Sequence, residues 1–300
     1  FATVKAALLE YLKARTGGTV PISLKQTWEE VAAAPAFTGL LNETYGSGAE
    51  AAYSTRRLNG NVTDCMVIRR ASGTPATTTI GFDGSGNIDE AAITTFCTGT
   101  SCTVESWLDQ SGNGNDATQA TPANQPTIYT GGALVKENGK LALDFDGGDG
   151  LSHTSDLSLS ACSIFTTLEA TNATRVWYGE NGSNYLATFT TNISCNANNV
   201  QRQGLDIPSN QTLYNFTRDG SVGGTWYKNG TALTATGSQT NETLLLNSLG
   251  GFSPYRHIGA FQEMIVYPSD KSGTDQTSIE SNVGDYFTQN TPLLDTYSGA

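Results

Sequence analysis

Short β-type segments separated by turn residues recur from Phe37 to the last quarter of the chain, and this spacing limits the fold more than any other feature. The clearest signal is the stretch Thr225–Thr234, where Asn229-Gly230 marks the tip of a hairpin. Strands at regular intervals predict an all-β fold, a sandwich of two antiparallel sheets. The other predicted strands are residues 64–70, 77–81, 141–145, 162–168, 175–178, 185–190 and 257–267.

The first 36 residues have a different pattern. Val4, Leu8, Leu9 and Leu12 share one helical stripe, and Thr27–Glu30 is a capping box ahead of a second short helix that Pro35 ends. We therefore predict a short helical N-terminal arm over residues 1–36 and the sandwich over 37–291. The arm is too short for a core of its own, so it must dock on its own domain or on another subunit.

Two more short helices are expected within the sandwich region. Residues 87–96 have an acidic first turn, which the helix dipole favours. Residues 275–289 place Ile279, Val283 and Phe287 at four-residue spacing, which is typical of a helix that packs one face on a core.

Charge excludes two classes of partner. The net charge is −12 and the pI is about 4.5, whereas nucleic acids and anionic membrane surfaces select clustered Lys and Arg. No apolar run reaches the roughly 18 residues of a membrane span. We expect neither nucleic acid nor membrane as a partner, and no cofactor.

The stretch Val104–Asp116 predicts a strand that runs into a tight polar loop, Asp109–Gly114. Gly112 and Gly114 can take positive φ, and the Asp and Asn side chains can bond to their own backbone. Just before it, Cys97 and Cys102 are close enough to close a small ring. We predict a disulfide between them, with two thiols in a reducing compartment as the alternative.

The end of the chain resembles an earlier segment. Residues 293–300 repeat, in shortened form, the segment Leu40–Ala49 that leads into the sandwich. Residues 292–300 are therefore predicted to lead into a further repeat, with coincidence as the alternative.

Two regions carry a family resemblance. Ala52–Arg57, the strand ending at Arg70, the cysteine loop and Asp109–Gly114 together resemble the catalytic domain of the fungal α-L-arabinofuranosidase B family. Gly259–Asp270 and the last helix look like the end of concanavalin A-like (laminin-G-like) domains. Similar combinations occur in virion proteins of tailed phages. The resemblance implies a concanavalin A-like jelly-roll sandwich over about residues 40–290.

Catalysis of the family type is not expected from the residues. Retaining glycosidases need a nucleophile and an acid, both carboxylates. The family acid follows a Gly-Gly pair before the last strand, where this chain has Gly250-Gly251-Phe252. The family nucleophile belongs to a stretch whose counterpart, between Tyr185 and Leu205, lacks a matching glutamate. We therefore assign no catalytic residue and predict that the chain is not an enzyme.

Other candidate sites are weaker. Asp83–Asp89 spaces oxygen atoms as a calcium loop does, but it lacks the glutamate at the twelfth position, so we predict a polar turn and no metal site. His153 and His257 have no metal-ligand spacing and are predicted to lie on the surface or in loops. The candidate glycan-binding residues are Trp107, Asp109, Asn113, Trp226 and Tyr227, with core packing as the alternative for the aromatic side chains.

These observations favour a non-enzymatic structural protein of a phage particle, as a head decoration, fibre or tail-associated component. Its arm would bind other virion proteins or sister subunits, and its sandwich could contact host or environmental glycans. The alternative is a secreted carbohydrate-binding protein or an arabinofuranosidase-like glycoside hydrolase that uses displaced carboxylates.

Overall fold

The computed structural model describes residues 37–74, 76–169, 175–189, 192–197, 200–205, 211–220, 223–237 and 242–287. The chain divides into two units, Phe1–Thr38 and Gly39–Ala300, and the elements of the fold belong to the second. The predicted helical arm, 1–36, and the predicted lead-in, 292–300, lie outside the described residues and remain predictions.

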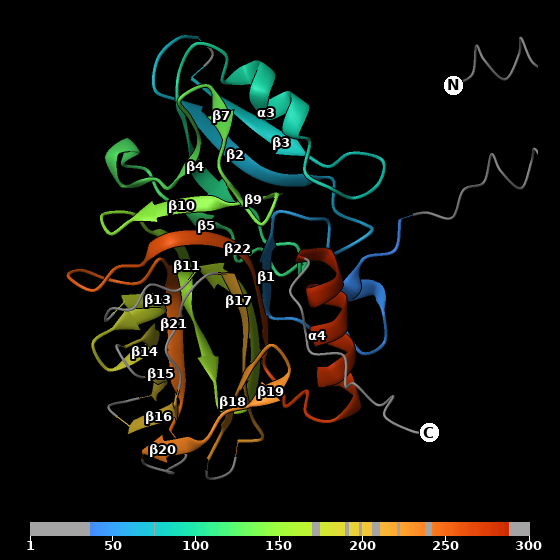
Figure 1. The fold of residues 1–300 in the computed structure, drawn as a ribbon, viewed down its shortest axis with the longest axis vertical. Coiled ribbons are helices and arrows are strands. Elements are labelled where there is room, and N and C mark those ends of the chain that lie inside the picture. Colours follow the sequence, from blue (N-terminus) through green and yellow to red (C-terminus); the bar gives the residue numbers. More distant parts are fainter. Residues whose placement is uncertain are drawn as a thin grey trace, which may run out of the picture. The chain divides into compact units, whose positions relative to one another are not determined.

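The described fold is all-β, as predicted, and its strand pairs are antiparallel (Figure 1). The described residues also include two α-helices and two 3-10 turns. The helical elements are η1 (Leu40–Asn42), α3 (Glu90–Phe96), η2 (Pro122–Asn124) and α4 (Thr274–Phe287). The strands are β1 (Ala51–Ser54), β2 (Asp64–Arg70), β3 (Thr77–Gly81), β4 (Cys102–Trp107), β5 (Ala117–Thr118), β6 (Thr127–Thr130), β7 (Ala133–Leu134), β8 (Lys136–Glu137), β9 (Lys140–Leu141), β10 (Leu143–Asp146), β11 (Leu151–Leu159), β12 (Cys162–Glu169), β13 (Arg175–Asn181), β14 (Asn184–Thr188), β15 (Asn192–Ala197), β16 (Val200–Leu205), β17 (Gln211–Arg218), β18 (Thr225–Lys228), β19 (Thr231–Ala232), β20 (Ala235–Gly237), β21 (Leu244–Leu249) and β22 (Ile258–Tyr267). None of the described helices has the length and apolar content to cross a bilayer.

Strand β22 connects distant parts of the chain. It pairs with β1 and β10 along one edge and with β12 along the other. The pairing of β22 with β12 shifts register between Phe261 and Glu263. After this shift, Met264 and Val266 point into the main core, while Ile265 and Tyr267 point to the opposite face. Successive strand residues face opposite sides, so one continuous apolar run supplies both faces.

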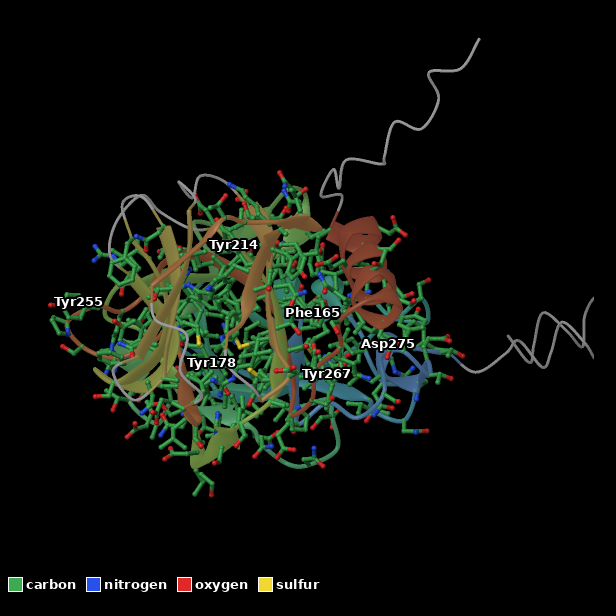
Figure 2. The ribbon with its side chains drawn as sticks, turned by 90° about the horizontal axis from the view of Figure 1, so that it is seen from below. Phe165, Tyr178, Tyr214, Tyr255, Tyr267 and Asp275 are labelled. Carbon is green, nitrogen blue, oxygen red and sulfur yellow. A yellow bond between two sulfur atoms is a disulfide. The ribbon has the colours of Figure 1, made fainter. Side chains whose placement is uncertain are left out.

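The main core gathers buried side chains of β12, β17 and β22 together with those of β11, β21 and β13–β15. Large aromatic side chains fill it. Figure 2 shows Tyr178 and Tyr214 within the molecule, and both are fully buried. Tyr255, at the edge of the same view, is 47% exposed. Among the described residues it is the one large hydrophobic side chain that is exposed to solvent.

A second core lies under α4. Ile279, Val283 and Phe287, the predicted helical stripe, pack against Phe165 of β12 and Tyr267 of β22. The rings of Phe165 and Tyr267 meet edge to face, with centroids 5.9 Å apart. The helix, red in Figure 1, thus covers the outer face of these strands. Burial of an apolar helical stripe is the interaction that holds such a helix in place.

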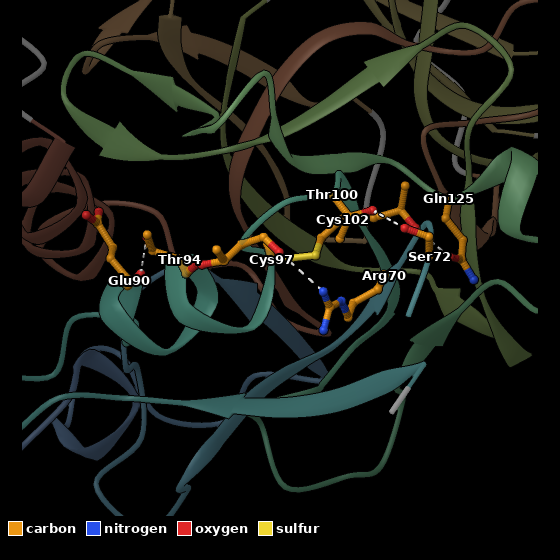
Figure 3. The surroundings of a disulfide bond; sticks show 10 residues. Arg70, Ser72, Glu90, Thr94, Cys97, Thr100, Cys102 and Gln125 are labelled. Atoms are coloured by element: carbon orange, nitrogen blue, oxygen red, sulfur yellow. Dashed lines mark hydrogen bonds between the residues drawn. A yellow bond between two sulfur atoms is a disulfide. The ribbon is translucent and has the colours of Figure 1, made fainter. Parts of the chain in front are cut away.

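Cys97 and Cys102 form a disulfide between the end of α3 and the start of β4 (Figure 3). Both side chains are fully buried. Near it, Arg70 donates to the carbonyl oxygen of Thr98 at 3.2 Å. The disulfide therefore fixes the turn that joins helix and strand. Cys65, Cys162 and Cys195 are buried thiols.

Replacing both Cys97 and Cys102 by Ala should lower the free energy of unfolding by about 2 kcal/mol. The two cysteines are separated by five positions, so the disulfide closes only a small loop. Such a disulfide removes little conformational entropy from the unfolded chain, and its stabilising effect is modest. Urea unfolding of the variant and of the wild type under non-reducing conditions measures the difference. An unchanged unfolding midpoint would contradict a stabilising role.

Candidate active site

Asp109, the first residue of the polar loop, is a buried structural carboxylate. It accepts hydrogen bonds from the backbone N–H groups of Ala52 (2.8 Å), Ser111 (2.9 Å) and Asn115 (3.0 Å). The Ser111 hydroxyl donates a fourth at 2.7 Å. With its oxygen atoms engaged in this way, Asp109 holds the loop against β1 and is not available to a ligand.

The rest of this loop clamps the same segment. Gln110 is fully buried; its oxygen accepts the N–H of Leu58 at 2.7 Å, and its amide group donates to the Arg56 carbonyl at 3.0 Å. Asn113 donates to the carbonyl oxygen of Glu50 at 3.0 Å. The loop therefore positions residues 49–58. The proposed glycan contact of Asp109 is replaced by structural hydrogen bonds, whereas that of Asn113, whose side chain is exposed, stays a prediction.

Burial also changes the prediction for the aromatic candidates. Trp107 has no exposed surface, and its ring packs on Tyr53 and Phe261. Trp226 is 3% exposed and packs on Phe216. Neither indole can stack on a sugar, so both glycan assignments are corrected to core packing. Tyr227 is half-buried and lines a small polar hollow.

Both histidines are buried. His153 lies in strand β11, contrary to the prediction of a surface or loop position, whereas His257 lies in the loop before β22. His153 contacts the Tyr178 hydroxyl at 2.8 Å. His257 lies between Phe145 and Phe261, and burial lowers its pKa to about 4. Local patterns could not predict either aromatic environment, because Tyr178 and Phe145 belong to other strands.

The Asp83 loop is a polar turn, as predicted. Asp83 accepts the N–H groups of Ser85 at 2.8 Å and Asn87 at 2.9 Å, which hold its pKa below the ordinary value despite the opposing effect of burial. Across the described part of the chain, no group of three His, Cys, Asp or Glu residues is placed to hold a metal ion.

The structure brings together three carboxylates that sequence reasoning did not connect: Glu137 of β8, Asp144 of β10 and Glu169 of β12. We call them the carboxylate group. Asp144 pairs with Ala260 of β22, and the Ala260 N–H donates to Glu169 at 3.3 Å. Asp144 and Glu169 therefore flank β22 on either side, with their backbones about two strand spacings, roughly 10 Å, apart.

Strand periodicity puts Asp144 and Glu169 on one face. Leu143 and Phe145, the neighbours of Asp144, point into the main core, as does Leu168, the neighbour of Glu169. Alternation along a strand directs the two carboxylates to the opposite, outer face. Asp144 is exposed there and Glu169 is half-buried. A ligand on this face could therefore contact both groups.

The charge of Glu169 acts on the other two carboxylates. Burial, and then the charge of Glu169, raise the pKa of Glu137, although the Gln211 backbone N–H acts against them. Burial raises the pKa of Asp144, and the charges of Glu169 and Asp146 raise it further. Like charges that share a site favour the protonated form of one partner. This pattern of perturbed carboxylates is typical of sites that carry out acid–base chemistry.

Amide side chains hold the β8–β9 hairpin over this face. Gln262 of β22 donates to the carbonyl oxygen atoms of Glu137 at 3.1 Å and Lys140 at 3.2 Å. Gln211 of β17 donates to Gln262 and accepts from Asn138. This amide network fixes Glu137 beside Glu169, so the position of the third carboxylate depends on β17, β22 and the hairpin together.

A fourth acid, Asp149, lies in the turn after β10 and is 4% exposed. Burial, with the nearby charges of Asp146 and Asp144, raises its pKa to about 6, although the Asp146 N–H, bound at 3.1 Å, acts against the shift. Because the folded protein binds this proton more tightly than the unfolded chain, Asp149 stabilises the fold fully below pH about 4 and loses that contribution up to pH about 6.

Asp149→Asn should therefore be more stable relative to wild type at pH 7 than at pH 4, by up to about 3 kcal/mol. Asparagine keeps an oxygen for the Asp146 N–H but carries no charge. Urea unfolding of both proteins at the two pH values gives the difference. An effect of the substitution that is equal at pH 4 and pH 7 would rule out a raised pKa.

At the position of the family acid, the structure has an aromatic contact. Gly250 and Gly251 both have positive φ, and Phe252, which follows them, meets the ring of Tyr185 with centroids 6.1 Å apart. An added Cβ on Gly251 would lie 2.2 Å from the carbonyl oxygen of Val176. Close backbone approach explains this glycine, and the carboxylates lie elsewhere, on the outer face of β10 and β12.

The sequence of residues 42–139 matches the family described as α-L-arabinofuranosidase B, catalytic. This segment includes the polar loop, the disulfide and Glu137. No curated protein sequence matches the chain.

Solved structures extend the likeness. An arabinofuranosidase complexed with arabinofuranosyl-α-1,2-xylobiose has 20% sequence identity and a TM-score of 0.57. A GH54 α-L-arabinofuranosidase soaked with a cyclic sulfate inhibitor gives 0.59, and a mutant soaked with 4-nitrophenyl α-L-arabinofuranoside gives 0.58, both at 20% identity. Each likeness covers 78% of this chain and 62% of the other, so the chain spans less than two thirds of those proteins.

These matches overturn two predictions. The interpretation as a phage structural protein is wrong, and so is the expectation of a non-enzymatic chain, because both comparisons lead to a glycoside hydrolase domain. Missing carboxylates at two family positions do not exclude an enzyme, because Asp144 and Glu169 lie at other places in the fold. The chain resembles α-L-arabinofuranosidases in sequence over residues 42–139 and in fold over 78% of its length.

Proposed function

We propose that the chain is an arabinofuranosidase-like glycoside hydrolase that releases α-L-arabinofuranosyl groups, with Glu169 and Asp144 as its catalytic carboxylates. The observation that carries the proposal is the carboxylate group on the outer face of β10 and β12, in a fold similar to that of arabinofuranosidases. The finer architecture that we infer is the concanavalin A-like jelly-roll sandwich.

The two carboxylates take different roles. Asp144 has a raised pKa, so it retains a proton more readily and acts as the general acid on the glycosidic oxygen. Glu169, oriented by the Ala260 N–H, acts on the anomeric carbon, either directly as nucleophile or as the base that activates water. Glu137 lies beside Glu169, and burial and the Glu169 charge raise the pKa of Glu137.

An oxidising location agrees with this function. The buried disulfide between Cys97 and Cys102 is typical of proteins outside the reducing cytosol. We infer a secreted enzyme.

Hydrolysis of 4-nitrophenyl α-L-arabinofuranoside by the purified chain tests the proposal. We expect release of nitrophenolate, and ¹H NMR of the first-formed sugar gives the anomeric outcome, which reports whether Glu169 attacks directly or through water. No release above the uncatalysed rate across pH 4 to 8 would reject the proposed hydrolase. Binding of the glycoside without turnover would instead favour a carbohydrate-binding protein.

A further inference from the structure

The chain carries nine Asn-X-Ser/Thr triplets, the acceptor motif for N-linked glycosylation. A glycan of this kind is bulky and polar, so the asparagine that carries it must lie on the surface of the folded protein. The structure describes the asparagine side chain in five of the nine triplets, namely Asn42, Asn61, Asn192, Asn215 and Asn229. These five residues differ in exposure and in hydrogen bonding, and the differences select one of them.

Burial excludes two of the five. Asn215 of β17 is 1% exposed, and its amide nitrogen donates to Glu280 at 3.2 Å. Asn192 of β15 is half-buried, and Ser194, the third residue of its triplet, has no exposed surface. A glycan on either asparagine would require the packing around its strand to open.

Asn42 and Asn229 reach the surface, but their side chains hold the backbone of neighbouring segments. The Asn42 oxygen accepts the N–H groups of Gly39 at 3.0 Å and Gly60 at 2.6 Å. At the tip of the β18–β19 hairpin, the Asn229 oxygen accepts the N–H of Leu213 at 3.1 Å. These bonds fix each amide group against the protein surface, which hinders the approach of a glycosyl donor.

Asn61 is both exposed and unengaged. It lies in the turn Asn59–Val62, which the Val62 N–H closes on the Asn59 carbonyl oxygen at 3.1 Å. The Asn61 N–H donates to the Asn59 side chain at 3.0 Å, so the turn is fixed through its backbone. No described residue forms a hydrogen bond with the Asn61 amide group, and Thr63, the third residue of the triplet, is also exposed. The side chain can therefore take a glycan without the loss of a hydrogen bond.

We propose that Asn61 is an N-glycosylation site, occupied when the chain is exported through a eukaryotic secretory pathway. In this transfer the Asn61 amide nitrogen loses a proton and bonds to the anomeric carbon of an oligosaccharide. The bond from that carbon to its carrier, a lipid pyrophosphate, breaks, and the pyrophosphate leaves with the bonding electron pair. The proposal needs export, with which the disulfide between Cys97 and Cys102 agrees, and it does not depend on hydrolase activity.

Peptide mapping tests the site. The full chain is directed into the secretory pathway of a eukaryotic host by a signal sequence, and a peptide N-glycosidase then removes N-linked glycans in ¹⁸O-labelled water. This enzyme converts each occupied asparagine to an aspartate that carries the label. We expect the label at Asn61 in most molecules and none at Asn215. Asn61→Gln and Thr63→Ala should each lower the intact mass by one glycan, whereas Thr63→Ser, which keeps the motif, should retain it.

An unlabelled Asn61 in wild type would overturn the proposal, as would an intact mass that Asn61→Gln leaves unchanged. Label at Asn215 in the folded protein would contradict the selection of Asn61 by exposure. Chain retained inside the host is mapped in the same way, because the transfer precedes secretion. Circular dichroism confirms that wild type and variants are folded.

Discussion

Glu169→Gln should lower kcat for 4-nitrophenyl α-L-arabinofuranoside by about 10²–10⁴-fold, the usual contribution of a carboxylate in acid–base or nucleophilic catalysis. The amide keeps the size of the side chain but cannot attack carbon or accept a proton. Steady-state kinetics of the variant and the wild type measure the effect. Glu43→Gln, outside the carboxylate group, is the matched control and should keep wild-type kcat.

Asp144→Asn tests the assignment of the acid. Nitrophenolate leaves readily without a proton, whereas a sugar leaving group needs one, so the variant should lose far more activity on arabinofuranosyl-α-1,2-xylobiose than on the aryl glycoside. Equal losses on the two substrates would place Asp144 in another role. Full activity of Glu169→Gln would remove the carboxylate group from catalysis.

Glu263→Ala should lower the free energy of unfolding by about 3–5 kcal/mol, because it leaves the Arg56 guanidinium buried without its partner. The pair is bidentate, with N–O distances of 2.8 and 3.0 Å, and its side chains are 9% and 1% exposed. Ser54 also donates to Glu263 at 2.6 Å, and Arg56 donates to Asn282 of α4 at 2.7 Å. The network ties β1, β22 and α4 together.

Urea unfolding measures this loss, and an exposed ion pair provides the comparison. Lys136 and Glu90 lie 2.7 Å apart, each more than a third exposed, so Lys136→Ala should cost at most about 1 kcal/mol. A Glu263→Ala effect as small as that of Lys136→Ala would show that the buried network contributes little to stability.

Local sequence patterns predicted many of the fold's elements. The Asn229-Gly230 turn, the strand 162–168 and the apolar stripe of 275–289 correspond to β18–β19, β12 and α4. Strand β17, Gln211–Arg218, was not predicted. Its polar and apolar residues are all buried, since β12 covers one of its edges and both of its faces are packed, so the sequence shows no half-exposed alternation.

The carboxylate group could not be predicted from local patterns. Glu137, Asp144 and Glu169 belong to three strands, and only the pairing of β22 with β10 and β12 places two of them beside Ala260. The family resemblance implies acids at two positions, near Gly251 and Tyr185, and there the structure has Phe252 packed on Tyr185. A comparison with the family motif positions does not detect carboxylates that lie on another face of the fold.

Catalysis by Glu169 is tested most directly by ¹H NMR of arabinofuranosyl-α-1,2-xylobiose incubated with wild type and with Glu169→Gln. We expect that wild type releases free arabinose and leaves xylobiose, and that Glu169→Gln releases neither at a measurable rate. Intact substrate with both proteins, or equal release by both, would contradict it.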